Sequence, residues 1–123
     1  MRLLLLTMLS LLALCPLRAE KQQAVIFIDS SDTAQTALIA EINHSLFYSP
    51  TLRSQVAVQV FDINPRGLAF SGELDFRRDA KGQAVSQYRP GQLPYVFCRN
   101  DREMITQFTL RNMDQLCLCI KKD

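Results

Sequence analysis

One short run, LPYVFC from Leu93 to Cys98, constrains the fold more than any other part of the sequence. Its proline has no N–H to donate within a sheet, so it normally begins a strand or lies on an edge strand. The turn-forming pair Pro90-Gly91 precedes the run, and a polar turn from Arg99 to Arg102 follows it. The Leu93–Pro94 bond is also a candidate for the cis isomer, which folds retain where a tight backbone approach needs it. The sequence therefore predicts a strand that begins at this proline.

A strand, a helix and a second strand are predicted before this run. Residues 24–28 (AVIFI) are apolar without alternation, as expected for a central strand covered on both faces. Ser31 or Asp32 can cap the helix that follows. Residues 56–61 alternate and predict the second strand, which ends at Asp62. The helix is expected to bury Ala34, Ala37, Leu38, Ile42 and Leu46.

A hairpin and a last helix are predicted after the run. The polar turn at 99–102 separates two β-rich segments, which is typical of a hairpin whose second strand lies within 103–110. Asn112 is placed to cap a helix that reaches Ile120. The expected buried face of that helix carries Met113, Leu116, Cys117 and Ile120. Residues 66–90 carry no decisive pattern and are left open.

The N-terminus has the pattern of a secretory signal peptide. Arg2 is basic, residues 3–14 are almost wholly apolar, and Ala19 is a small residue suited to cleavage. An uncleaved anchor is the alternative, but the run is shorter than the roughly 20 residues that span a membrane. A lipoprotein site at Cys15 is a further alternative, although Leu14 stands where Gly or Ala is preferred. The domain division is thus a signal peptide at 1–19 and one domain at 20–123, with a periplasmic location.

Removal of residues 1–19 would leave equal numbers of basic and acidic residues, since it takes two of the 14 Lys and Arg and none of the 12 Asp and Glu. The basic residues are scattered rather than gathered in a stripe, so nucleic-acid binding is not expected. No second apolar segment is long enough to span a membrane, and no stable span is expected after cleavage.

The order of elements resembles the thioredoxin-like fold, an α/β fold with a central mixed sheet, here of about four strands, and flanking helices. Three segments carry the resemblance: FDINP at 61–65, GQLPY at 91–95 with Pro94 as the cis-proline, and the turn NDRE at 100–103. The resemblance covers most of residues 24–122. The redox pair of that family should open the first helix, but residues 30–35 read SSDTAQ, without cysteine. Thiol exchange needs an activated thiolate there and a second thiol to resolve the mixed disulfide.

The run from Leu93 to Cys98 also resembles the Val-Pro…Val-Val-Phe-Cys run of periplasmic pilus-assembly proteins of F-type conjugative (type IV secretion) systems. Those proteins have a signal peptide and a thioredoxin-like domain without the redox pair, and they are longer than this chain. The resemblance implies a partner-binding surface rather than a catalytic site, with the loop before the cis-proline offering backbone groups to an extended peptide. Its residues would be Ser30, Ser31, Gln92, Leu93, Pro94 and Tyr95.

Three cysteines follow the expected cleavage point, which predicts one disulfide and one leftover thiol in an oxidising compartment. Cys98 is expected to bond with Cys117 or Cys119; we favour Cys119, because helix ends fray and can turn inward. A Cys-x-Cys redox or metal pair is the sharper alternative for Cys117 and Cys119. Zinc generally needs four N or S ligands, and His44, the only histidine, is remote in sequence. No metal and no cofactor are expected.

Two aspartates end strands at the same sheet edge, Asp29 and Asp62, where α/β folds bind ligands. A carboxylate pair is one interpretation, and capping or turn roles are the simpler one. We expect a non-catalytic periplasmic protein that binds another periplasmic or secretion-apparatus protein. The alternatives are a divergent thiol-disulfide oxidoreductase using Cys98 or the Cys117/Cys119 pair, and a small secreted effector or inhibitor.

Overall fold

A computed structural model describes residues 21–120 of the chain. The expected signal peptide at 1–19 lies outside the described residues. The elements are β1 (Gln22–Ile28), α2 (Thr33–Tyr48), α3 (Pro50–Gln55), β2 (Val56–Asp62), β3 (Asp75–Arg78), α4 (Gln83–Tyr88), β4 (Tyr95–Arg99), β5 (Met104–Thr109), the 3₁₀ turn η1 (Met113–Leu116) and α5 (Cys117–Ile120). Among the described residues no helix is long and apolar enough to cross a membrane.

The strands form one mixed sheet in the order β3-β2-β1-β4-β5. The strand β1 pairs in parallel with β2 and antiparallel with β4, so it lies at the centre, as its unbroken apolar run predicts. The hairpin of β4 and β5 is confirmed, with a register irregularity at Cys98/Arg99. The fold class is confirmed, but the expected count of about four strands is too low, because β3 adds a fifth from the segment that carried no decisive pattern.

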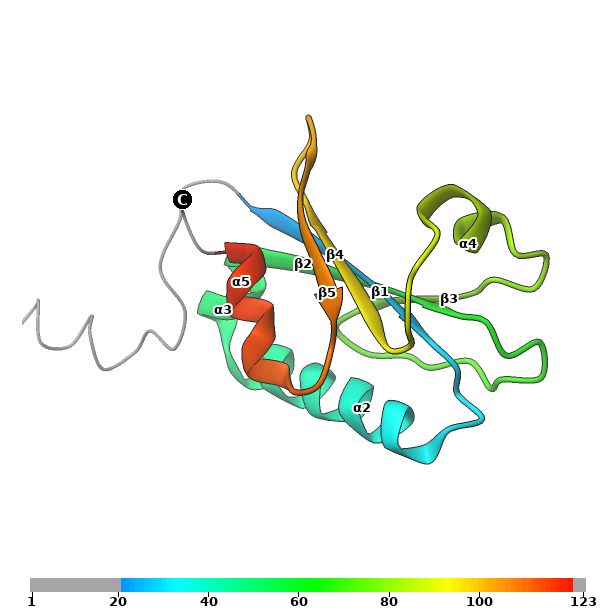
Figure 1. The fold of residues 1–123 in the computed structure, drawn as a ribbon. Coiled ribbons are helices and arrows are strands. Elements are labelled where there is room, and N and C mark those ends of the chain that lie inside the picture. The colour runs from blue at the N-terminus through cyan, green and yellow to red at the C-terminus, as the bar shows by residue number, and fades with distance from the viewer. Residues whose placement is uncertain (1–20, 121–123) are drawn as a thin grey trace, which may run out of the picture.

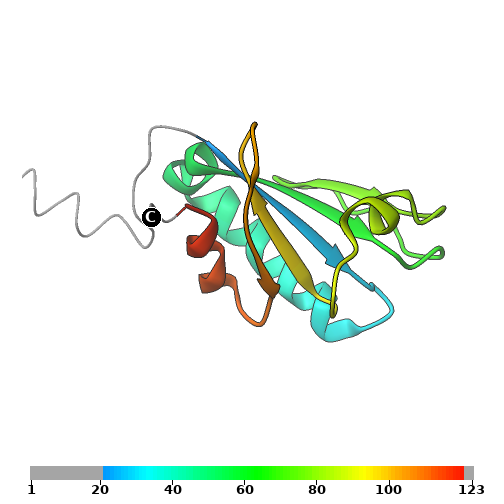
Figure 2. The same ribbon diagram turned by 45° about the horizontal axis from the view of Figure 1, so that its top comes forward.

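Helices cover the two faces of the sheet unequally (Figures 1 and 2). On one face, α2, η1 and α5 enclose a core that includes Ile26 and Ile28 of β1 and Val58 and Val60 of β2. On the other face, a smaller cluster of Val25, Phe27, Ala84 and Phe97 lies under the short helix α4. Successive residues of β1 thus enter different cores, which is why this strand shows no alternation.

The helix α2 begins where the sequence predicts, with Asp32 as N-cap, accepting a hydrogen bond from Ala34 N. Its buried face differs in part from the prediction. Ile42 and Leu46 are buried as expected and Leu38 is half-buried, but Ala34 and Ala37 are exposed. Gln35 and Ile39 are buried in their place. Gln35 is the informative exception, because its side chain accepts from the Asp29 N–H and so belongs to the turn rather than to the core.

The last helix is also rotated relative to the prediction. Asn112 lies at the N-cap position, and Leu116 and Ile120 are buried, but the third buried residue is Cys119, while Cys117 is half-buried. The first turn is a 3₁₀ helix, with 3.0 rather than 3.6 residues per turn. Over three residues this shifts the side chains by about 60° relative to an α-helix. The shift brings Cys119 into the core in place of Cys117.

Candidate functional site

The loops after β1 and before β4 meet at one edge of the sheet. Phe27 pairs with Tyr95 in the antiparallel ladder, so Ile28 and Pro94 are the next residues beyond that pair. The Leu93–Pro94 peptide bond is cis, as the resemblance implies. Figure 1 shows the end of β1 and the beginning of β4 at the same end of the sheet. The loop that carries Ser30 and the loop that carries Leu93 therefore leave the sheet at the same end.

A tight turn of hydroxyl and carboxylate groups stands where thioredoxin-type enzymes carry their thiols. The Asp29 carboxylate accepts from Ser31 N at 3.0 Å and from Ser31 Oγ at 2.7 Å. These two hydrogen bonds hold the pKa of Asp29 below its ordinary value, and the bond from the Ser31 hydroxyl has the larger effect. The turn then passes into the Asp32 cap of α2. The start of this helix is thus closed by oxygen ligands, and no sulfur atom is available there for exchange.

The loops after β1 and β2 are joined through a buried carboxylate. Asp62 is fully buried, and its Oδ1 accepts from Ser30 N and Asn64 N, both at 3.0 Å. Asn64 Nδ2 in turn donates to Ser30 Oγ at 3.0 Å. The second oxygen, Oδ2, makes no hydrogen bond within residues 21–120. Asp29 and Asp62 therefore each organise a loop, which agrees with the simpler of the two interpretations.

The cis-proline loop leaves part of its backbone unpaired. Pro94 C=O accepts from Leu110 N at 2.8 Å, whereas neither the N–H nor the C=O of Leu93 is hydrogen-bonded to any residue in the described part of the chain. The Leu93 side chain packs on the smaller core under α4. Gln92 is exposed, and the Tyr95 hydroxyl donates to Gln107 Oε1 at 3.1 Å. A free amide and carbonyl on an anchored residue are what an added strand needs.

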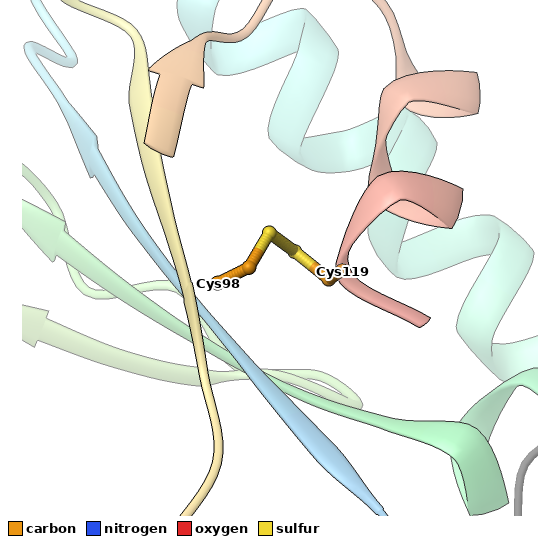
Figure 3. The surroundings of a disulfide bond; sticks show 2 residues. All are labelled: Cys98 and Cys119. Atoms are coloured by element: carbon orange, nitrogen blue, oxygen red, sulfur yellow. A yellow bond between two sulfur atoms is a disulfide. The ribbon is translucent and has the colours of Figure 1, made fainter. Parts of the chain in front are cut away.

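The cysteines lie away from this edge. Cys98 and Cys119 form a disulfide between β4 and α5, with a Cα–Cα distance of 4.9 Å, and neither residue is exposed (Figure 3). Cys98 is four residues along the strand from Pro94, or about 13 Å. The described residues contain no free cysteine, so the predicted leftover thiol is not found. The leftover thiol was predicted from an odd number of cysteines after the expected cleavage point. Such a count does not show which sulfur atoms lie close together in the fold.

The remaining candidates do not converge. His44 is exposed near the end of α2, and its ring contacts that of Tyr48 in a tilted arrangement, with 4.6 Å between the ring centroids. Among residues 21–120 no three His, Cys, Asp or Glu side chains are grouped to hold a metal ion.

The link from Asp62 to Ser30 and Asn64 was not predicted from the sequence. The only signal for it was the position of Asp62 and Asn64 at the end of a strand that neighbours Ser30.

Similar folds occur in solved structures of low sequence identity. StoA from Bacillus subtilis matches with a TM-score of 0.65 and 12% identity, over 82% of this chain and 83% of its own. The exposed lipoprotein thioredoxin of Streptococcus pneumoniae strain TIGR4 matches with a TM-score of 0.57 and 13% identity, over 80% and 81%. The C-terminal domain of an uncharacterized protein from Bacteroides fragilis NCTC 9343 gives 0.50 and 11%, over 81% and 78%.

These matches define the class of the protein: it has a thioredoxin-like fold, in which the position of the redox pair carries serines and aspartates. At this level of identity, the likeness extends to the fold alone. No family model and no curated protein matches the sequence.

Proposed function

We propose that this protein is a non-catalytic, periplasmic binding component that holds an extended segment of another exported protein. The observation that carries the proposal is the unpaired backbone of Leu93 beside a helix start that has no thiol. In strand addition, main-chain hydrogen bonds supply affinity, and neighbouring side chains supply selectivity. Gln92, Tyr95 and Ser31 are the side chains placed to do so.

The arrangement argues against thiol exchange at the same edge. Exchange needs a thiolate that can reach the sulfur of its partner. Cys98 and Cys119 are both fully buried in the larger core, and they are bonded to each other rather than Cys119 to Cys117. Their bond therefore acts as a structural link between β4 and α5.

We further propose that the partner belongs to a conjugative transfer or type IV secretion apparatus. The support is the likeness of LPYVFC at 93–98 to the run that conjugative pilus-assembly proteins carry. The run includes the cis-proline and four of the five residues of β4, so it covers both the proposed binding loop and the strand that supports it.

Site-specific photo-crosslinking tests the binding proposal. A photoreactive residue at Gln92, in the full chain expressed in its own cells, should give one discrete cross-linked product. The same residue at Glu41, which is exposed on α2, is the matched control and should give none. Mass spectrometry then identifies the partner. Absence of a product from Gln92, or the same products from both positions, would contradict the proposal, and a partner outside a transfer apparatus would remove its second part.

An insulin-reduction assay tests the alternative of a divergent thiol-disulfide oxidoreductase. We expect the purified protein to add nothing to the rate given by dithiothreitol alone. We also expect peptide mapping under mild reductant to find Cys98 still bonded to Cys119. Acceleration of the reaction, or mixed disulfides trapped with other proteins, would favour the oxidoreductase instead.

A further inference from the structure

A second concave surface lies on the helix side of the sheet, apart from the cis-proline loop. It is a cleft of about 350 Å³ between α2, the end of β1 and the loop that follows β2. Its apolar walls are Ile28, Ile39, Phe70 and Phe76, which belong to or pack on the larger core. Leu93 packs on the opposite core, so the cleft and the proposed binding loop lie on different faces of the sheet, although Ser30 is a candidate residue of both.

The rim of the cleft carries an apolar side chain with an unusually large exposed fraction. Leu68 lines the cleft and is 87% exposed, the highest value among the large hydrophobic residues described. Leaving a leucine in water forgoes the free energy of burial. A ligand that brings an apolar group into the cleft would cover Leu68 along with the walls.

The same rim carries donors that the fold does not use. The guanidinium of Arg66 makes no hydrogen bond or ion pair with any described residue. The backbone N–H groups of Leu68, Ala69 and Phe70 also have no partner within residues 21–120. A guanidinium beside free amides suits a carboxylate, which accepts charge-assisted hydrogen bonds. The nearby Asp62 carboxylate is fully buried: its Oδ1 accepts from two amides, and its Oδ2, which makes no hydrogen bond within residues 21–120, is buried against Gly67.

We infer that this cleft binds the C-terminal residue of a polypeptide, with an aliphatic side chain against Phe70 and Phe76 and the terminal carboxylate at Arg66. Free amides of a loop are a recurring way to capture a chain terminus. Ser30, Thr36 and Asn64 also line the cleft, and these polar groups suit the amide groups of a peptide better than a long acyl chain. The inference goes beyond the function proposed above and does not depend on strand addition at Leu93.

Two-dimensional NMR titration of the ¹⁵N-labelled protein tests it. The probe is acetyl-Gly-Gly-Leu with a free carboxylate, and the comparison is the same peptide ended by a carboxamide. We expect the acid to shift the amide signals of Leu68, Ala69 and Phe70, and the carboxamide to bind about tenfold more weakly, since it loses the charge-assisted bonds. Arg66→Gln should weaken binding of the acid about tenfold as well.

The control variant is Arg102→Gln, which removes the same charge at the turn between β4 and β5, outside the cleft. It should leave the affinity unchanged. Leu68→Ser, a change at an exposed position, should weaken binding without unfolding the protein. Equal binding of acid and carboxamide, equal effects of the two arginine variants, or no shifts at millimolar peptide would overturn the inference. Binding of octanoate but not of the peptide would also overturn it, because the occupant would then be a lipid.

Discussion

Gly67 packs closely against side chains of the loops at the end of the sheet. A Cβ atom built on it would lie 2.2 Å from Asp62 Oδ2 and 2.7 Å from Ser30 Oγ. Real Cβ atoms do not approach other atoms so closely, and the buried Asp62 carboxylate has little room to move. The absence of a side chain at Gly67 therefore lets the loop after β2 close over Asp62.

Replacement Gly67→Ala should destabilise the protein by about 1–3 kcal/mol, the usual range for overpacking. Denaturant unfolding measures the change. The matched control is Gly91→Ala, where the added methyl would meet only the Tyr95 ring at 3.5 Å, an ordinary contact. If the two variants had equal stability, the close packing at Gly67 would not constrain the loop.

At the scale of elements, α4 is a short helix that depends on its cap and on packing. It has six residues, begins after Gly82 at φ 69° and ends at Arg89 at φ 55°. Its main anchor is the Asp79 carboxylate, whose two oxygens accept from Ala84 N and Val85 N, both at 3.0 Å. An isolated helix of this length is not stable in water, so the cap and the packing of Ala84 keep it folded.

Loss of that cap by Asp79→Ala should cost about 0.5–2 kcal/mol of stability. Hydrogen exchange should show faster opening of α4, with β1 unaffected. Asp75→Ala is the control, because Asp75 is exposed on the edge strand β3 and its ion pair with Arg77 is worth little. Equal exchange in the two variants would mean that Asp79 does not hold the helix.

For the whole molecule, the disulfide joins the hairpin to the C-terminal helix across the larger core. Cys98 and Cys119 are 21 residues apart in sequence, so the bond restricts the unfolded chain as well as the folded one. For a loop of about this length the restriction is worth about 3 kcal/mol. The bond stabilises the packing of α5 on the sheet, and it is not part of the proposed binding surface around Leu93.

The double replacement Cys98→Ala/Cys119→Ala should therefore lower the free energy of unfolding by about 2–4 kcal/mol. Cross-linking at Gln92 should persist at temperatures where the variant remains folded. Wild-type protein in strong reductant should lose at least a similar amount of stability. Loss of the cross-link in a variant that remains folded would show that partner binding requires the disulfide.

The sequence alone determined the elements whose signals are local. The apolar run at 24–28, the alternation at 56–61 and the proline before the strand at 95–99 each predicted a strand that the structure contains. The sequence also predicted that Ser31 or Asp32 caps the start of α2, and Asp32 is the N-cap, because a cap is decided by a few neighbouring atoms. The likeness to the thioredoxin-like order rested on these same local signals.

Only the tertiary structure decided features that depend on distant residues. The strand β3 is weakly coded and forms because β2 offers it an edge to pair with. Burial of Cys119 rather than Cys117 follows from a 3₁₀ turn that no apolar pattern announces. The junction of Ser30, Asp62 and Asn64 joins two loops, and the cleft beside Leu68 needs the helix, the strand end and the loop together. Such sites arise from packing between segments, so their geometry is absent from any one stretch of the chain.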